Sequence, residues 1–286
     1  MPTDHLQSFL FDNTDIRGAI VTLDKSLADQ FHAHDYSTAQ QTLLGRFLAA
    51  NLLMSSHIKL DGLLSLQVRG QGPVSLLMSE CTQDLAFRGI IRSESDIDAD
   101  NFQQLFAGGM FAITMEPKQG NRYQGIVAIE KPTLADCLAG YFEQSEQLPT
   151  RFYFAEHRHK ITGLMLQALP ASQCLDDQQR REDWQRILCL TDTITAAEAC
   201  ELPTETLLHR LYHEEALRVF NPRAVRFHCN CSRERMERAL LSMDHDELDS
   251  ILAEDGRIET ECHFCHRQYV FQQAEMQHLL QSGNTH

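Results

Sequence analysis

Two close pairs of cysteines stand in the last sixty residues of the chain. The first pair is Cys229 and Cys231, and after thirty intervening residues Cys262 and Cys265 form the second. Sulfurs two or three residues apart on a turn can point at one ion, and two such pairs complete a tetrahedral shell of four thiolates, the arrangement that selects Zn²⁺. The spacing therefore predicts one zinc ion per chain, bound by these four cysteines in the reduced protein.

The segment that carries these cysteines, residues 227–286, is too small to fold easily on apolar burial alone. Structural zinc sites contribute about 10–16 kcal/mol of apparent binding free energy, which is available only when the ligands come together. We therefore expect metal binding and folding of this C-terminal module to be coupled. An iron–sulfur cluster or two independent redox pairs would use the same residues and stays an alternative. Because four cysteines already fill the shell, we expect the neighbouring histidines on the surface or around the ligands: His228, His263 and His266.

Two roles are open to such a site. Most cysteine-only zinc sites are permanent structural clips. Four clustered thiolates can also act as a switch, because an oxidant that reaches them can convert each close pair into a disulfide and release the ion. A disulfide across Cys229 and Cys231 closes a small ring that should be readily reduced again, whereas Cys262 and Cys265 have the spacing of common redox pairs. Spacing alone leaves both roles open.

Nothing else in the sequence completes a catalytic constellation, so we expect no enzyme. A serine-nucleophile elbow and a metalloprotease-type histidine pair are both absent from the sequence. Two groups of acid–base residues lack completing partners and are expected on helix and loop surfaces: His157 with His159, and His213 with Glu214 and Glu215. The remaining cysteines have no partner at ligand spacing and are expected to be buried small hydrophobes: Cys81, Cys137, Cys174, Cys189 and Cys200.

The composition is that of a folded globular protein, since 43% of the 286 residues are apolar and 23% are charged. With 25 basic and 40 acidic residues the formal net charge is −15, which repels phosphate backbones and anionic lipid. We therefore expect neither nucleic acid nor a membrane as the main partner. The N-terminus lacks the pattern of a secretory signal, and the most apolar stretch is too short to span a bilayer. These features predict a cytoplasmic protein whose cysteines are kept reduced.

Residues 1–175 alternate strand-like and helical runs and predict an α+β domain built on an antiparallel or mixed sheet. Ser37 is expected to cap a buried helix that carries Leu43, Phe47 and Leu52 at helical spacing. Two hairpins are expected from turn formers between alternating runs, at residues 64–78 and 110–129. Further strands are expected at 16–23, 151–155 and 164–169, and further helices at 101–106 and 134–142. A glycine-rich nucleotide loop is absent from the sequence.

A charged run at residues 176–183 marks a boundary, and residues 176–226 are predicted to form a helical linker. Thr204 is a candidate cap. The apolar faces of these helices must pack against another part of the protein, and their exposure would create a surface that binds other apolar chains. The faces consist of Trp184, Ile187 and Leu188 on one helix, and of Leu207, Leu208, Leu211, Tyr212 and Leu217 on another.

The C-terminal module is expected to contain two helices and two short strands. Ser232 is expected to cap the first helix, Asp244 with Glu247 to start the second, and Gly256 to end it. The strands are expected at residues 258–260 and 269–271, around the second cysteine pair. Together with the preceding segments this predicts three parts, residues 1–175, 176–226 and 227–286.

A constitutive zinc-ribbon adaptor or RNA-binding protein is the alternative to a switch. Zinc ribbons often bind nucleic acid, and such binding would fall with salt. Glu234 and Glu237 dilute the positive charge around the first cysteine pair. The arginines that would make this contact are Arg223, Arg226, Arg233, Arg235 and Arg238.

The residues around both cysteine pairs closely resemble the 33 kDa chaperonin family, the redox-regulated bacterial heat-shock chaperones. The resemblance rests on the segments 227–235, 251–256 and 262–265. It extends over essentially the full length, in the order of the family's motifs: residues 70–73, 123–127, 141–150, 163–167 and 211–215.

The resemblance implies an ATP-independent holdase that binds unfolded or partly unfolded client proteins under oxidative and heat stress. It implies that the reduced, zinc-bound form is inactive. Oxidation would form the disulfides Cys229–Cys231 and Cys262–Cys265, release zinc, unfold the module and the linker, and expose apolar surface. The resemblance further implies a homodimer as the active form, and it favours the switch over the clip.

Overall fold

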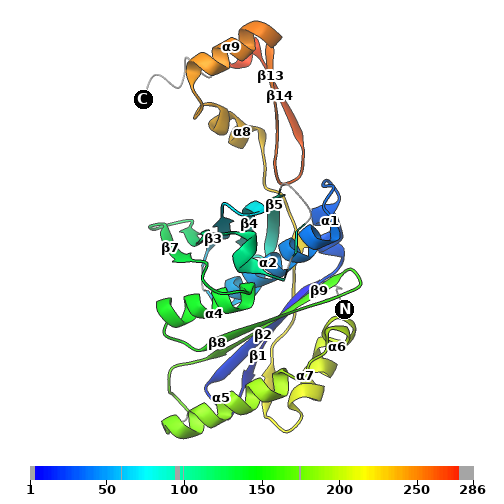
Figure 1. Cartoon of the computed structure of the whole chain (residues 1–286), viewed down its shortest axis with the longest axis vertical. Helices are drawn as coiled ribbons and strands as arrows, with labels where there is room; N and C mark the ends of the chain where they lie inside the picture. Colours follow the sequence, from blue (N-terminus) through cyan, green and yellow to red (C-terminus); the bar gives the residue numbers. More distant parts are fainter. Residues whose placement is uncertain (1–3, 59, 94–96, 99, 174, 277–286) are drawn as a thin grey trace. The chain divides into compact units, whose positions relative to one another are not determined.

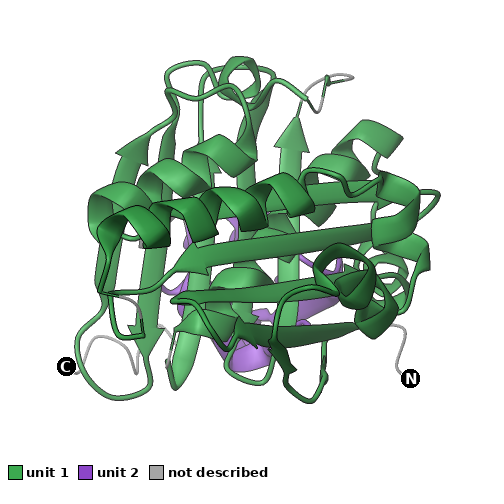
Figure 2. Ribbon diagram, turned by 90° about the horizontal axis from the view of Figure 1, so that it is seen from below, with its two compact units in different colours: residues 1–228 green, residues 229–286 purple. Residues whose placement is uncertain are grey.

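The structure, a computed structural model, describes residues 4–58, 60–93, 97–98, 100–173 and 175–276. It divides into two compact units, residues 1–228 and 229–286 (Figure 2). Each unit has its own hydrophobic core.

The first unit contains two six-stranded sheets. The first sheet has the order β10-β1-β2-β9-β8, with β11 also paired to β1, and the second has the order β12-β5-β4-β3-β6-β7. Every pair is antiparallel except β12 with β5. The predicted α+β class with an antiparallel or mixed sheet is therefore confirmed. The first sheet comprises β1 (His5–Phe11), β2 (Ile16–Leu23), β8 (Thr150–His157), β9 (Lys160–Ala168), β10 (Leu217–Val219) and β11 (Arg223–Ala224). The second comprises β3 (Gly62–Arg69), β4 (Val74–Thr82), β5 (Ala86–Ser93), β6 (Met110–Pro117), β7 (Tyr123–Ala128) and β12 (Arg226–Phe227).

Helix α2 (Thr38–His57) lies between the two sheets (Figure 1). The side chain of Ser37 accepts a hydrogen bond from the backbone of Gln40, whose side chain in turn accepts one from the backbone of Ser37, as the sequence predicts for a cap. Between Leu43 and Met54 the helix is buried on nearly all sides, because it packs against β2 and β9 on one side and β4 and β5 on the other. Within the described residues no helix has both the length and the apolar character needed to cross a bilayer.

Three helices of the 176–226 segment cover the other face of the first sheet (Figure 1). They are α5 (Asp177–Thr191), α6 (Ala196–Glu201) and α7 (Thr204–Tyr212). Alternate residues of a strand point to opposite faces. Accordingly Ala19 and Val21 of β2 belong to the core around α2, whereas Ile16 and Ile20 belong to the core under α5 and α7.

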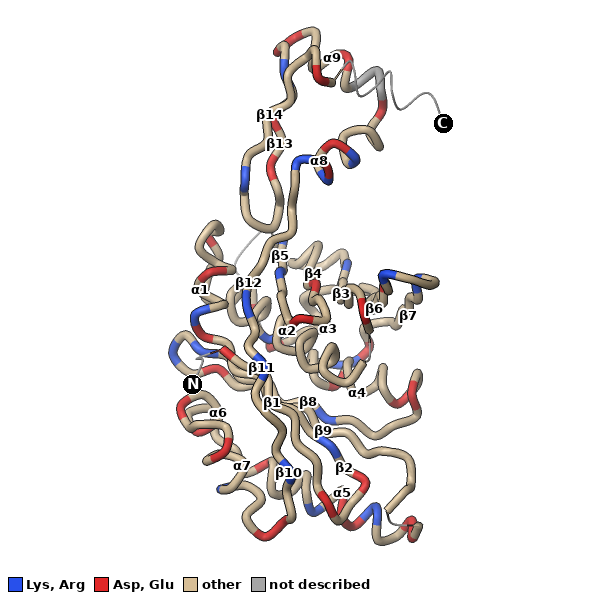
Figure 3. The backbone as a smooth tube through the Cα atoms, turned by 180° about the vertical axis from the view of Figure 1, so that it is seen from behind, with Lys and Arg blue, Asp and Glu red and all other residues tan. Residues whose placement is uncertain are grey.

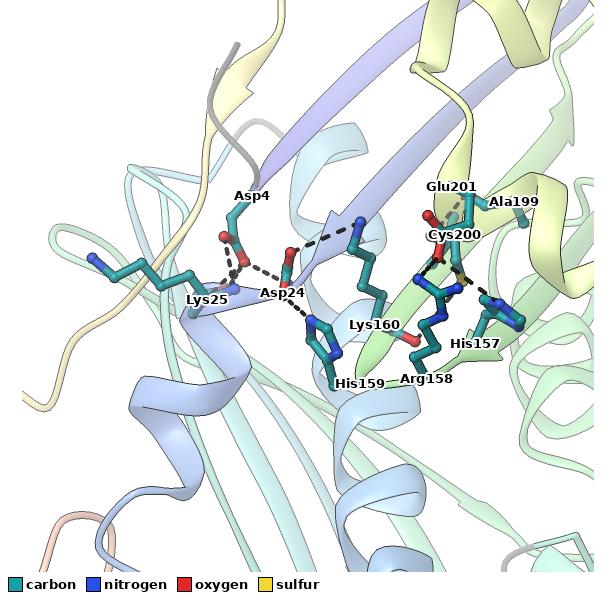
Figure 4. Close-up of polar contacts among 12 residues, drawn as sticks. Asp4, Asp24, Lys25, His157, Arg158, His159, Lys160, Ala199, Cys200 and Glu201 are labelled. Atoms are coloured by element: carbon teal, nitrogen blue, oxygen red, sulfur yellow. Dashed lines mark hydrogen bonds and ion pairs between the residues drawn. The ribbon is translucent and has the colours of Figure 1, made fainter.

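Polar contacts hold α6 and the start of α1 (Lys25–Phe31) near the β8–β9 turn (Figure 4). Glu201 at the end of α6 lies 3.6 Å from Arg158 and 3.9 Å from His157. His159 lies 2.9 Å from Asp24, the residue before α1. The two histidines that the sequence left without a catalytic partner therefore contact carboxylates at the surface. The remaining helices of this unit are α3 (Phe102–Leu105) and α4 (Leu134–Ser145), as expected from the sequence.

The second unit consists of α8 (Arg233–Leu240), α9 (His245–Asp255) and a hairpin of β13 (Arg257–Glu261) and β14 (Gln268–Gln272). The side chain of Ser232 caps α8 by accepting the backbone N–H of Arg235. Gly256 has a φ of +67°, in the left-handed region that favours glycine, and ends α9. The order of two helices and two strands, the cap at Ser232 and the end of α9 at Gly256 are therefore confirmed. The role of Glu247 in starting α9 lies outside the side chains that the structure describes.

Two expectations about local structure were wrong. Leu217 does not continue a helix but begins β10, where main-chain pairing with β1 decides its conformation. Thr204 is the first residue of α7, and Pro203 occupies the cap position without a side-chain hydrogen bond. Strand β1 and strand β5 were not anticipated at all. The division of the first unit at residue 175 stays a prediction.

The C-terminal end of α2 carries a histidine that is neutral in the folded protein. Nε2 of His57 is buried and has no hydrogen-bond partner among the described residues. Burial, with the nearby Arg17 as a smaller cause, lowers the pKa of His57 from 6.5 to about 3. Because unfolding restores the ordinary pKa, the unfolded chain binds more protons between these two values. The first unit should therefore lose stability as the pH falls from 6.5 toward 3, and it should gain nothing from this group above that range.

We expect His57→Gln to remove part of this sensitivity to acid. Urea unfolding followed by circular dichroism should show that the variant loses less stability than the wild type between neutral pH and about pH 5, by up to about 2 kcal/mol. Equal losses in the two proteins would contradict the assignment.

Candidate metal centre

The structure brings together the four cysteines that the sequence singles out. Their sulfur atoms all lie within 4.8 Å of one another. The Sγ atoms of Cys229 and Cys262 are 3.6 Å apart, and those of Cys231 and Cys265 are 3.5 Å apart. The first pair lies just before α8, and the second lies in the turn between β13 and β14. Among the described residues, this group could hold a metal ion.

The hairpin turn fixes the second pair by main-chain hydrogen bonds. The carbonyl of Cys262 accepts the N–H of Cys265 at 3.2 Å and the N–H of His266 at 2.7 Å. The N–H of Cys262 donates to the carbonyl of Arg267 at 3.0 Å. His266 has a φ of +54°, which reverses the chain directly after the second sulfur. The turn thereby holds both sulfurs of this pair in the same cluster.

The spacing of the sulfurs fits a tetrahedral thiolate site. A Zn–S bond of about 2.3 Å in a regular tetrahedron places sulfurs about 3.8 Å apart. Close contact with Cys229, followed by burial, raises the pKa of Cys262, and burial is the first cause that raises the pKa of Cys265 to about 11. Cys262 and Cys265 therefore resist ionisation in the metal-free cluster, and a divalent cation would supply the positive charge that stabilises thiolates there.

Tyr269 of β14 is a part of the site that sequence reasoning treated only as a strand residue. Its side chain is buried, and its hydroxyl donates a hydrogen bond to Sγ of Cys231 at 3.1 Å. A buried tyrosine needs a partner for its hydroxyl, and this alone could have suggested a sulfur in a module with so few buried acceptors. Groups that contact metal ligands tune the affinity and reactivity of the site.

The histidines and arginines near the cysteines lie around the cluster. His228, His263 and His266 are exposed and do not belong to the group of clustered ligand atoms among the described residues. Arg233 contacts Glu275 at 2.6 Å and lies over the ring of Phe271, 4.2 Å from its centre. This arginine therefore stabilises the second unit.

Three of the isolated cysteines are buried as expected, namely Cys81, Cys137 and Cys200. Burial raises the pKa of Cys81 to about 12, so its thiol is unreactive at neutral pH. The expectation of burial was wrong for Cys189, which is exposed on α5. The reason is that α5 directs Ile187 and Leu188 toward the sheet, which places Cys189 outside the packed stripe. Cys174 lies outside the described residues.

The fold and the cysteine cluster define the class of this chain: an α+β protein with a separate unit built around four thiols. The family model described as "Hsp33 protein" matches residues 4–272. A "33 kDa chaperonin" of Pseudomonas aeruginosa (strain LESB58) is 45% identical over 281 residues, which cover 97% of this chain and 95% of that protein. A "33 kDa chaperonin" of Azotobacter vinelandii is 42% identical over 285 residues, covering 99% and 96%.

A solved structure shows the same fold. The crystal structure of the 33 kDa chaperonin of Thermotoga maritima aligns with a TM-score of 0.78 at 22% identity and covers 99% of each chain. The chain belongs to the Hsp33 family.

Removal of one thiol should weaken the site without any oxidant. We expect Cys262→Ser to lower the zinc content of the purified protein and to destabilise the second unit, because only three thiolates remain. Metal analysis and thermal melting measure the two effects. Cys189→Ser, which changes an exposed thiol on α5, is the matched control and should behave like the wild type. Wild-type zinc content and melting in Cys262→Ser would refute a four-cysteine site.

Loss of the tyrosine hydroxyl should change the metal affinity while the fold persists. We expect Tyr269→Phe to bind zinc about tenfold more weakly, because Cys231 loses its hydrogen-bond donor while the ring stays in place. Competition with a chromogenic chelator measures the affinity. Tyr153→Phe removes a hydroxyl that donates to Asp192 in the first unit at 2.9 Å and should leave zinc affinity unchanged. Equal affinities in all three proteins would show that Tyr269 does not influence the cluster.

Proposed function

We propose that this protein is a redox-regulated, ATP-independent chaperone that holds unfolding client proteins and prevents their aggregation under oxidative and heat stress. Membership of the Hsp33 family supports a chaperone. The observation that supports the proposed regulation is the apolar face of the first sheet that α5, α6 and α7 cover. These helices precede the cysteine cluster along the chain. As the family resemblance implies, the active form would be a homodimer in the cytoplasm.

The first step is oxidation of the cluster. In the reduced protein, Cys229, Cys231, Cys262 and Cys265 would hold Zn²⁺. Each close pair of thiolates would give two electrons to one molecule of peroxide, so that one S–S bond forms, and the peroxide would take up two protons from solvent and become two molecules of water. The disulfides would be Cys229–Cys231 and Cys262–Cys265, and the ion, having lost its ligands, would leave.

The second step is loss of structure in the second unit. Its buried core is small, and Cys231 and Cys262 are themselves part of it. Without the metal, apolar burial in a unit of this size does not offset the conformational entropy of folding. Oxidation would therefore unfold residues 229–286.

The third step is release of the linker helices. Helices as short as α5, α6 and α7 are marginal in water, so they persist only while they are packed on the sheet. Their packing combines apolar contacts with polar ones, two of which are the hydrogen bonds from Tyr153 to Asp192 at 2.9 Å and from Thr162 to the carbonyl of Ala199 at 3.0 Å. Destabilisation of the chain that follows α7, especially with heat, would let this segment unfold.

The last step is exposure of the sheet face to a client. The uncovered residues would be Phe9, Phe11, Ile16, Ile20, Leu164 and Leu166, all of them now buried. A contiguous apolar surface of this kind is an interaction site for other apolar chains. Holding a client needs such a surface and no bond-making chemistry, in keeping with a protein that is not an enzyme.

Light scattering from a thermally unfolding client tests this function. The protein would be added either reduced and zinc-loaded, or after peroxide treatment at elevated temperature, without ATP. We expect only the oxidised sample to suppress aggregation. Suppression by neither sample, or equally by both, would refute redox control and favour a structural zinc clip.

A substitution under the linker should activate the protein without oxidant. Ile187 of α5 is fully buried against the sheet, so Ile187→Asp places an unpaired charge in this contact and should release the linker. Trp184, the only tryptophan in the chain, lies on the same helix and packs against the same core, so its fluorescence should shift to the red. The reduced variant should then suppress client aggregation.

Gln185→Asp is the matched control, because it adds the same charge at an exposed position of α5. It should leave both the fluorescence and the inactive state of the reduced protein unchanged. A reduced Ile187→Asp protein with red-shifted Trp184 fluorescence and no effect on aggregation would show that the covered face does not hold clients.

A further inference from the structure

Residues 216–228, which we call the strap, close one edge of each sheet in the first unit. Within the strap, β10 and β11 pair with β1, and β12 pairs with β5. An open strand edge exposes main-chain N–H and C=O groups that can pair with another chain. One short segment therefore occupies pairing sites on two different sheets (Figure 3).

Main-chain hydrogen bonds hold the strap along its length. The N–H of Phe220 donates to the carbonyl of Ser8 at 2.9 Å, and the N–H of Val225 donates to the carbonyl of Asp4 at 3.3 Å. At its end, the N–H of His228 donates to the carbonyl of Phe87 at 2.9 Å. Bonds of this kind do not depend on sequence, so another extended chain could form them as well.

Few side chains of the strap are buried. Val225 is 5% exposed and enters the core around α2, and Phe227 packs against the same core. Arg218 and Phe220, by contrast, are exposed. A chain that binds at these edges therefore needs an apolar side chain at the position of Val225, whereas many side chains would fit at the exposed positions of the strap.

The charge of the strap indicates the chemistry of a chain that could replace it. The strap contains three arginines and no acidic residue, whereas the whole chain has a net charge of −15. Arg218 pairs with Asp12 at 2.8 Å, and Arg223 donates to the carbonyl of Gln83 at 2.7 Å. A basic, partly apolar, extended segment is therefore complementary to this edge.

We infer that the edges of β1 and β5 beneath the strap form a second client-binding surface, which receives an extended basic and apolar client segment as an added strand. This inference rests on the proposed function, because the strap lies between α7 and Cys229 and would be freed when the helices before it and the unit after it unfold. In the reduced protein the strap occupies the site as an internal competitor. An unfolding client offers extended segments that can replace it.

A synthetic peptide of the strap, residues 216–228, tests the inference on the full-length protein. The matched control is the same peptide with N-methyl groups on Phe220 and Val225, which removes the two N–H donors and leaves every side chain and charge in place. Binding of labelled peptide to the oxidised and the reduced protein is measured by fluorescence anisotropy, and displacement by an unfolding client is measured in the same assay.

We expect the unmodified peptide to bind the oxidised protein at least tenfold more tightly than the N-methylated one, to be displaced by the client, and to bind the reduced protein at least tenfold more weakly. Equal binding of the two peptides, or binding of neither by an oxidised protein that still suppresses aggregation, would overturn strand addition and leave the proposed function standing. An oxidised protein that suppresses no aggregation would overturn the proposed function, and this inference with it.

Discussion

The close approach of four thiols in the second unit is the constraint on which the proposed regulation depends. Thiolates within 4.8 Å of one another repel, so a bound divalent ion would be what keeps four thiolates together. Two of these cysteines, Cys231 and Cys262, are part of the small hydrophobic core of the second unit. In the proposed account, oxidation of the sulfurs therefore unfolds the second unit directly, and no separate sensor is needed.

In the proposed account, the construction of the first sheet lets one segment unfold and expose a binding surface while the rest of the unit persists. One face is covered by α2, which is buried between two sheets and cannot leave without dismantling the unit. The other face is covered by short helices, α5 to α7, that are exposed on their outer side. Because successive side chains of β2 and β9 point to opposite faces of the sheet, both faces carry buried apolar residues. The difference in stability between the two covers, rather than between the two faces, determines which surface can be exposed.

Local patterns predicted the features that depend on near neighbours in the sequence. The capped helix that starts after Ser37, both hairpins and the turn around Cys262 and Cys265 are such cases. Long-range pairing was not predictable in this way: β10 begins at Leu217 because β1, two hundred residues earlier, offers it an edge. The contact of Tyr269 with Cys231 and the exposure of Cys189 also depend on tertiary packing, which a single sequence does not display.

Hydrogen–deuterium exchange on the full-length protein, reduced and zinc-loaded or oxidised at elevated temperature, tests the central claim most directly, namely that oxidation at the cysteines uncovers the first sheet. The account predicts that oxidation abolishes protection over residues 229–276 and over α5, α6 and α7, while α2, β2 and β9 keep theirs. Full protection of α5 to α7 in an oxidised protein that has lost its zinc would contradict it, because the apolar face would then stay covered.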